Sequence, residues 1–114
     1  MEKSNLNYSE QRPWGSFEIL LDENVCKIKK ITVNSGERLS YQFHYKRSEC
    51  WTVVYGKAKV RLDDKFLQLN SGDSVKIPAL AKHSVENISN TPLVFIEVQT
   101  GEYFGEDDEY EDDE

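Results

Sequence analysis

Short alternating strands are the structure that this sequence pattern favours most strongly. In KAKVRL, residues 57–62, three apolar side chains alternate with three basic ones. Side chains two apart in a strand point to the same face, so this alternation indicates a strand with one buried face. The turn DDK at 63–65 then leads into FLQL at 66–69, which predicts that the two segments form a hairpin.

The same pattern recurs along most of the chain, and no window of about 11 residues carries the apolar stripe of an amphipathic helix. Further strands are predicted at residues 16–21, 26–33, 38–44, 50–56, 74–78, 83–88 and 93–99. Many short strands separated by turns are typical of a sandwich or a small barrel, whose interior holds packed side chains or one small ligand. With 114 residues, the chain is long enough for one core and too short for two. The fold class predicted from these patterns is all-β.

Acidic residues are concentrated at the C-terminal end. Residues 102–114 hold nine of the 21 acidic groups and no basic one, which leaves 12 acidic groups against 14 Lys and Arg elsewhere. We therefore expect one domain at 1–101 and a partly or wholly disordered acidic tail at 102–114. Such a tail repels nucleic acid and anionic lipid, so neither is an expected partner.

Two features of the sequence bear on where the protein works. No apolar run approaches the roughly 20 residues that cross a bilayer, and the N-terminal 15 residues lack the apolar stretch of a signal peptide. Cys26 and Cys50 are too few for a disulfide framework. A cytoplasmic protein without a membrane partner is the expectation.

Four polar side chains have the spacing of a metal site. Gln42 and His44 lie two apart in a predicted strand and share a face, and Glu49 begins the next strand after a short connection. His83, the second histidine of the chain, follows a proline-led turn. Two imidazole nitrogens and two oxygens suit a divalent transition metal, namely Zn, Mn, Fe, Co or Ni. Each residue also has a purely structural interpretation, as a strand-edge or core side chain.

The spacing of the glycines around these residues adds to this interpretation. The two segments read Gly36-x5-Gln42-x-His44-x4-Glu49-x6-Gly56 and Gly72-x5-Pro78-x-Leu80-x2-His83-x3-Asn87. They resemble the two motifs of the cupin superfamily, a double-stranded β-helix or jelly-roll barrel. Gln42 stands where the commonest cupin has histidine, and Leu80 where it often has glycine. RPWGSFEIL, the segment 29–60, IPALAKHSVEN and IEVQTGEYFGEDD resemble, nearly end to end, the C-terminal domain of type II phosphomannose isomerases.

Those enzymes combine mannose-6-phosphate isomerase and mannose-1-phosphate guanylyltransferase activities. The resemblance implies an aldose–ketose isomerase of mannose 6-phosphate and fructose 6-phosphate, in carbohydrate metabolism and nucleotide-sugar biosynthesis. It also implies Gln42, His44, Glu49 and His83 as metal ligands and a homodimer. The chain departs from the family in lacking a glycine-rich phosphate loop, so nucleotidyl transfer is not expected. Tyr45 and Lys46 replace further histidines, and the tail is acidic where the family continues with apolar and basic residues.

A sugar phosphate also needs a cation and a proton carrier. Arg47 is the first candidate for the phosphate because guanidinium matches its geometry, and Lys30 is the second. Glu97 and Gln99 share a face of the last strand. If that face is interior, Glu97 is a candidate catalytic proton carrier and Gln99 a substrate contact. Alternatives are another metal-dependent cupin enzyme, such as an epimerase or dioxygenase, and a non-catalytic sugar-binding or regulatory partner of a separate guanylyltransferase.

Overall fold

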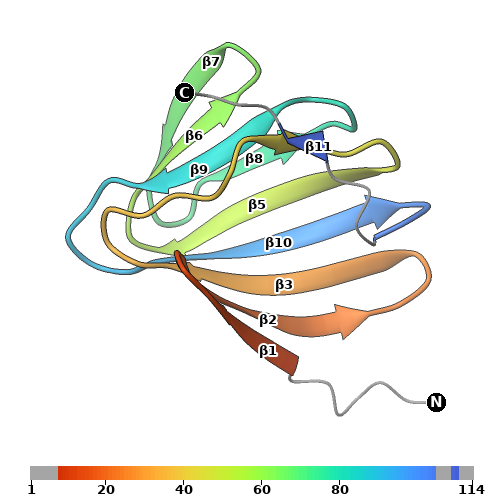
Figure 1. Cartoon of the computed structure of the whole chain (residues 1–114), viewed down its shortest axis with the longest axis horizontal. Helices are drawn as coiled ribbons and strands as arrows, with labels where there is room; N and C mark the ends of the chain where they lie inside the picture. Colours follow the sequence, from red (N-terminus) through yellow and green to blue (C-terminus); the bar gives the residue numbers. More distant parts are fainter. Residues whose placement is uncertain (1–7, 105–108, 111–114) are drawn as a thin grey trace.

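The computed structural model describes residues 8–104 and the backbone of residues 109–110. These residues form eleven strands and no helix (Figure 1). The strands are β1 (Tyr8–Arg12), β2 (Gly15–Asp22), β3 (Cys26–Val33), β4 (Gln42–Phe43), β5 (Arg47–Tyr55), β6 (Ala58–Leu62), β7 (Lys65–Leu69), β8 (Ser74–Ile77), β9 (His83–Asn87), β10 (Leu93–Gly101) and β11 (Glu109–Tyr110). None of the described residues belongs to a helix that is long and apolar enough to span a membrane.

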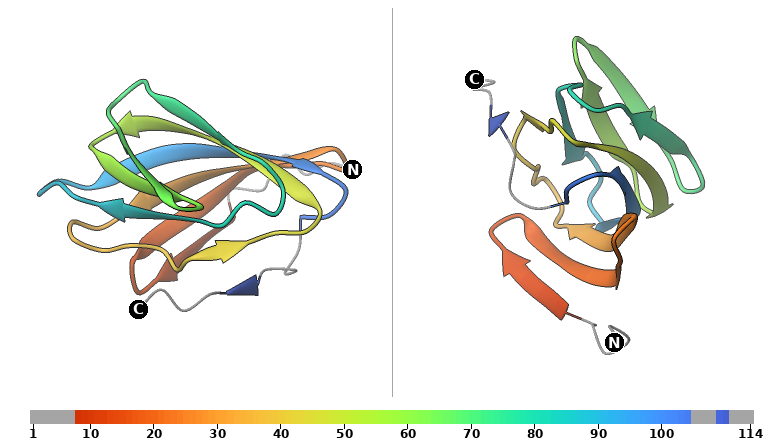
Figure 2. Two further views of the ribbon diagram at one scale, coloured as in Figure 1. Left: turned by 90° about the horizontal axis from the view of Figure 1, so that it is seen from above. Right: turned by 90° about the vertical axis from the view of Figure 1, so that its right-hand side faces the viewer.

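The strands form two antiparallel sheets that face each other. One sheet has the order β1-β2-β3-β10-β5-β8, and the other has the order β11-β4-β9-β6-β7. Figure 2 shows the two layers from above and from the side, with strands distant in sequence lying next to each other. The last long strand, β10, lies between β3 and β5 in the middle of the larger sheet. This arrangement confirms the predicted all-β fold of two packed sheets.

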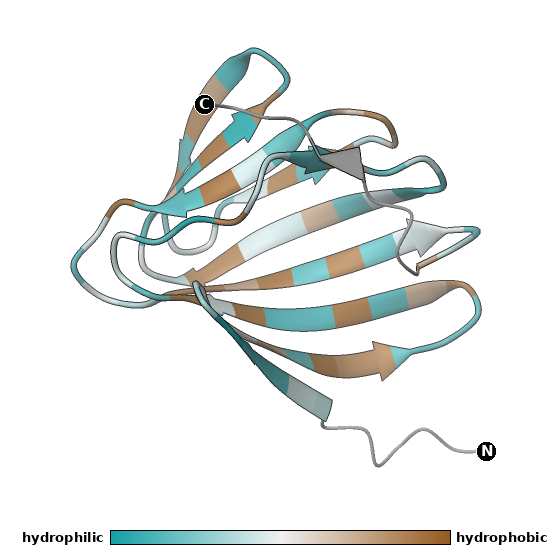
Figure 3. Ribbon diagram, viewed as in Figure 1, coloured by the Kyte–Doolittle hydropathy of each residue, from teal (hydrophilic) through white to brown (hydrophobic). Residues whose placement is uncertain are grey.

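The apolar core lies between the sheets. Eleven buried apolar residues form it, and in Figure 3 apolar and polar residues alternate along β3 and β10. Val33, Val60 and Leu93 have no exposed surface at all. The alternation in KAKVRL predicted this correctly, because Ala58 and Val60 are buried while Lys59 between them is exposed. Burial of one face of each strand therefore sets the register of both sheets.

Three segments differ from the predicted strands. The segment 38–44 forms a strand only at Gln42–Phe43, preceded by a single bridge between Arg38 and Glu86. β1 was not predicted, because its sequence YSEQR is polar and it forms an edge of the larger sheet. β11 lies within the predicted acidic tail and pairs with β4. Residues 105–108 and 111–114 of that tail lie outside the described residues, and the domain boundary after residue 101 stays a prediction.

The segment RPWG joins the first two strands to the core. Trp14 packs against the core, and its carbonyl accepts a hydrogen bond from the Asn34 amide at 2.9 Å. Gly15 has a φ of +150°, and a Cβ on it would lie 2.0 Å from the carbonyl oxygen of Thr32. No side chain fits there, so the glycine lets β2 lie against the end of β3.

The turn before β9 carries a strained residue next to the candidate site. Leu80 has a φ of +75°, a conformation that favours glycine, and its side chain is exposed. Its amide donates a 2.8 Å hydrogen bond to the carbonyl of His44. This bond ties the turn that leads to His83 to the segment that carries His44. The left-handed backbone explains why the cupin motif often has glycine at this position.

Candidate metal centre

The site lies where the inner face of the larger sheet changes from apolar to polar. On β3, β10 and β5, one row of cross-strand neighbours is apolar, and the next two rows are mostly polar. The apolar row is Ile31, Phe95 and Val53; the following rows are Lys29, Glu97 and Trp51, then Lys27, Gln99 and Glu49. A cavity of about 340 Å³ opens over the polar rows, and β4 and β9 contribute to its wall. The fold therefore places polar side chains inside one end of the barrel.

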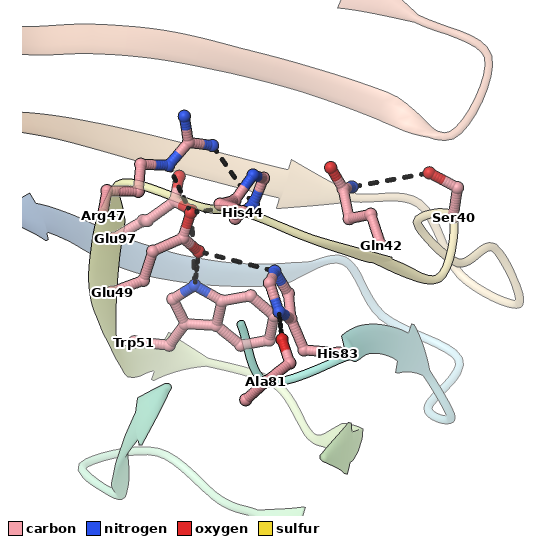
Figure 4. A network of polar contacts seen from close by, with 9 residues as sticks. All are labelled: Ser40, Gln42, His44, Arg47, Glu49, Trp51, Ala81, His83 and Glu97. Atoms are coloured by element: carbon pink, nitrogen blue, oxygen red, sulfur yellow. Dashed lines mark hydrogen bonds and ion pairs between the residues drawn. The ribbon is translucent and has the colours of Figure 1, made fainter. Parts of the chain in front are cut away.

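Three of the four predicted ligands meet in this cavity. His44, Glu49 and His83 each offer one ligand atom, and these atoms lie within 4.8 Å of one another. The Nε2 atom of His44 is 3.3 Å from Oε2 of Glu49, and Nε2 of His83 is 3.9 Å from Oε1. Each of the three residues is only 3% exposed. Figure 4 shows both imidazoles beside the Glu49 carboxylate.

The surroundings of His83 favour a neutral imidazole with one available nitrogen. Its Nδ1 atom lies 2.9 Å from the carbonyl oxygen of Ala81, a contact in which Nδ1 donates its proton. Nε2 then carries the lone pair and points toward Glu49, as a metal ligand requires. Burial lowers the pKa of His83 to about 4, and the bond to Ala81 acts in the opposite direction. His83 is therefore neutral at pH 7.

Gln42 lies at the wall of the same cavity, beside His83 in the β4–β9 register. Its Nε2 atom donates a 3.4 Å hydrogen bond to the hydroxyl of Ser40 (Figure 4). The side chain of Gln42 is partly buried, whereas those of His44, Glu49 and His83 are buried. The structure thus brings Gln42 to the site, with its amide turned toward Ser40.

Two donors orient the Glu49 carboxylate. Arg47 donates from Nε to Oε2 at 3.0 Å, and the Trp51 indole donates to Oε1 at 2.9 Å. Arg47 is 7% exposed, so it is not an exposed loop residue, and its Nη2 atom lies 3.2 Å from Nε2 of His44. Its first structural role is to balance a buried carboxylate. The hydrogen-bonding role of Trp51 was not predicted, because its sequence context indicates only a core or wall residue.

Glu97 faces the interior of the barrel. This is the orientation that its predicted role as a proton carrier requires. The residue is 6% exposed, and its Oε2 atom lies 3.4 Å from the indole nitrogen of Trp51. The same indole nitrogen also donates to Glu49. Burial raises the pKa of Glu97 to about 8, and the nearby Glu49 carboxylate acts in the same direction. Lys29 and Arg47 oppose this rise. A carboxyl group inside the cavity therefore keeps its proton at neutral pH in the metal-free protein.

We expect the stability of the metal-free protein relative to Glu97→Gln to fall as the pH rises from about 5 to 8. Between the usual value of 4.5 and the raised pKa of about 8, folded Glu97 holds a proton that the unfolded chain has lost. Rising pH therefore favours unfolding, by about 1.4 kcal/mol for each unit crossed. Urea denaturation of both proteins in EDTA, at several pH values across this range, measures this difference. A difference that does not change with pH would contradict the prediction.

The two remaining predicted substrate contacts, Gln99 and Lys30, lie in different surroundings. Gln99 lines the cavity and is 1% exposed, and its Oε1 atom has no hydrogen-bond partner among the described residues. Lys30 is exposed and is not among the residues that line the cavity, and its contact with substrate stays a prediction. Its neighbour Lys29 lines the cavity instead. In CKIKKITV, Ile28 and Ile31 lie an odd number of residues apart, so the sequence does not show which lysine faces inward.

The residues present fit a divalent metal ion. His44, Glu49 and His83 converge within reach of one ion, and Gln42 adds an amide oxygen at the wall. Nitrogen and oxygen donors in this proportion suit a transition metal. The neutral state of His83 and the contacts that hold Glu49 also match what ligands require.

Sequence comparison places the chain beside mannose-phosphate enzymes. It is 46% identical over 97 residues to mannose-1-phosphate guanylyltransferase 2 of Escherichia coli O157:H7, a match that covers 85% of this chain and 20% of that protein. It is 45% identical over 97 residues to the alginate biosynthesis protein AlgA of Pseudomonas aeruginosa, with the same coverage. The chain thus spans about a fifth of the length of the curated relatives it matches.

Comparison with solved structures supports the fold. An oxalate decarboxylase–formate complex from Lactobacillus farciminis matches with a TM-score of 0.80 and 22% identity, over 96% of this chain and 35% of that one. A Klebsiella pneumoniae protein with a double-stranded β-helix domain matches with a TM-score of 0.75 and 19% identity, over 83% of this chain and 82% of that one. At these identities the likeness shows the fold alone. The predicted double-stranded β-helix, or cupin, fold is confirmed.

The predicted isomerase function needs correction. The curated relatives are named as mannose-1-phosphate guanylyltransferases or as polysaccharide biosynthesis proteins, and none of the names given above is that of an isomerase. The interconversion of mannose 6-phosphate and fructose 6-phosphate was therefore wrongly inferred for this chain. The physical reason is that the matching motifs specify a barrel with a candidate metal site at one end, and this does not determine the reaction.

The family is nevertheless clear from the extent of the match. One family covers residues 2–113, and it is described as the mannose-6-phosphate isomerase C-terminal domain. That description names a C-terminal domain, that is, one part of a larger protein. This agrees with the match to the Escherichia coli relative, which covers only 20% of that protein. The fold, the cavity and the match over nearly all of the sequence agree, and the chain belongs to the mannose-6-phosphate isomerase C-terminal family.

Proposed function

We propose that this chain is a metal-binding cupin whose ligand is a phosphorylated mannose. The observation that carries this proposal is the cavity in which the buried side chains of His44, Glu49 and His83 converge. The name of the Escherichia coli relative supports the ligand, because mannose 1-phosphate is the substrate that this name states. In this proposal, the protein acts in the same branch of metabolism as the guanylyltransferases.

The metal in this proposal is Zn, Mn, Fe, Co or Ni, held by His44, His83, Glu49 and the amide of Gln42. When bound, such an ion supplies a Lewis acid for an oxygen of the sugar. Arg47 and Trp51 keep the Glu49 carboxylate in place through their two hydrogen bonds.

Two further side chains suit a hydroxylated ligand. The buried Oε1 atom of Gln99 accepts a hydrogen bond from a sugar hydroxyl, since it has no partner among the described residues. The Glu97 carboxyl keeps its proton at neutral pH and can donate it in a hydrogen bond. The cavity of about 340 Å³ lies at the lower end of the range for small-molecule sites. A single monosaccharide phosphate is therefore the proposed size class.

The proposed partner is a separate guanylyltransferase. The match to this chain covers about a fifth of each relative, and the rest of each relative lies outside it. The name of the Escherichia coli relative supports the choice of a guanylyltransferase as the proposed partner. The homodimer predicted from the family resemblance stays a prediction, which light scattering in solution would test.

Calorimetry on the metal-loaded protein tests the proposed ligand. Chelator-treated protein is reloaded with each of the five metals, and mannose 1-phosphate, mannose 6-phosphate and glucose 6-phosphate are titrated into it. We expect a mannose phosphate to bind with a dissociation constant of about 1 mM or tighter, and EDTA or the His44→Ala variant to abolish the binding heat. Protein that elemental analysis shows to be metal-loaded but that binds neither mannose phosphate would refute the proposal.

A further inference from the structure

Two cations surround one aromatic ring in the wall of the cavity. The Nζ atom of Lys29 lies 4.7 Å from the centroid of the Phe17 ring, and Cζ of Arg12 lies 5.5 Å from the same centroid. All three side chains line the cavity that contains His44, Glu49 and His83. They come from β1, β2 and β3, which are neighbours at one edge of the larger sheet. Positive charge is therefore concentrated on this part of the wall.

Lys29 is partly buried in the middle of this group. Its strand β3 lies between β2 and β10, and Lys29 is the cross-strand neighbour of Ile19 and Glu97. Within residues 8–104, its ammonium group makes no hydrogen bond and no ion pair within 4 Å; its close contact is the Phe17 ring, and it interacts electrostatically with the buried Glu97. A partly buried ammonium group without such partners favours the binding of an anion.

Arg12 adds a second set of donors at the exposed side of the ring. Its Nη2 atom forms a 2.8 Å ion pair with Glu10, and the side chains of both residues are partly exposed. A guanidinium group has five N–H donors, so this single contact leaves donors for a further anion. Lys29 and Arg12 thus both offer donors beside the same ring.

Gln99 gives an independent indication that the cavity takes a ligand. Its Oε1 atom is buried and has no partner in the part of the chain that the structure describes, and the residue is 1% exposed. A buried amide oxygen of this kind needs a donor, which a sugar hydroxyl supplies. A ligand that satisfies both Gln99 and Lys29 carries hydroxyl groups and an anionic group on one small molecule.

We propose that Lys29, assisted by Arg12, is the anchor for the phosphate group of the ligand, beside the Phe17 ring. This inference rests on the proposed function and adds the orientation of the ligand in the cavity. The phosphate group lies at Lys29, and the sugar hydroxyls face Gln99 and the histidines. A phosphate monoester is favoured over a single carboxylate because its three terminal oxygens can accept from both cations at once.

The adjacent lysine provides a matched control for the test. Lys29→Met removes the inward charge, and Lys30→Met removes the outward charge from the next residue of the same strand. Calorimetry with mannose 1-phosphate and mannose 6-phosphate is performed on both metal-loaded variants, and the metal affinity of each is measured separately. We expect Lys29→Met to weaken mannose phosphate binding about tenfold or more, while metal affinity is unchanged. Lys30→Met should bind like the wild type, and Lys29→Arg should retain most of the affinity.

The other outcomes separate this inference from the proposed function. If the wild type binds a mannose phosphate and Lys29→Met binds it equally well, the anchor is overturned and the proposed function stands. If Lys29→Met loses metal and sugar phosphate affinity to the same extent, the damage is general and the anchor is again overturned. If the metal-loaded wild type binds neither mannose phosphate, the proposed function and the anchor are both overturned.

Discussion

The Glu49→Ala variant is expected to unfold about 3–5 kcal/mol more easily than the wild type, because it removes the carboxylate that a buried arginine binds. Arg47 is 7% exposed and donates to Oε2 of Glu49 at 3.0 Å. The same substitution removes the acceptor of the Trp51 indole at 2.9 Å. Two buried donors then each lose an acceptor at once, which costs more than the deletion of a surface carboxylate.

Urea denaturation in EDTA measures this effect without any contribution from metal. Glu37→Ala is the matched control, because Glu37 is exposed, and its free energy of unfolding should stay within about 0.5 kcal/mol of the wild type. The double variant Arg47→Met with Glu49→Leu removes both charges, and we expect it to recover most of the loss. If Glu49→Ala unfolded like Glu37→Ala, the contacts of Arg47 would contribute nothing to stability.

The second large effect concerns metal affinity. Removal of one imidazole in His83→Ala should weaken divalent metal binding by at least about 100-fold. Loss of a residue that only orients a metal ligand already weakens metal affinity by up to about 100-fold, and loss of a ligand itself should cost more. His83 is neutral at pH 7, and its Nε2 atom lies 3.9 Å from Oε1 of Glu49, so in the wild type this ligand needs no deprotonation before it binds. Metal at about 100 times its dissociation constant should stabilise the wild type by about 2.7 kcal/mol, and the variant far less.

Thermal denaturation at increasing metal concentration, together with elemental analysis after dialysis, measures both quantities. Cys50→Ser is the control, because Cys50 is an exposed thiol in β5 that could bind metal unspecifically. That variant should keep the affinity and the stabilisation of the wild type. A His83→Ala variant that retains full metal content would place the metal elsewhere in the molecule.

Several features of the site could be predicted from the sequence because they depend on short-range spacing. Residues two apart in a strand share a face, so Glu97 and Gln99 were correctly expected on the same side of β10. The spacing of His44, Glu49 and His83 in the two motifs predicted that they would meet, and their ligand atoms lie within 4.8 Å of one another.

Other features could not be predicted, because they depend on which strands become neighbours. Glu97 is interior because the face of β10 that carries Leu93 and Phe95 packs on the core, and Glu97 shares that face. The burial of Arg47 follows from its contact with Glu49, and nothing in RSECW distinguishes a buried arginine from an exposed one.

The sequence by itself determined most of the strands, the all-β class and the residues that meet at the candidate metal centre, because alternation and motif spacing are local properties of the chain. Only the tertiary structure decided which lysine of the pair Lys29 and Lys30 faces the cavity. The apolar residues of β3 occupy both faces, so the sequence pattern permits either choice. Pairing with β2 and β10 removes this ambiguity, because Ile31 and Val33 must be buried in the core and Lys29 shares their face.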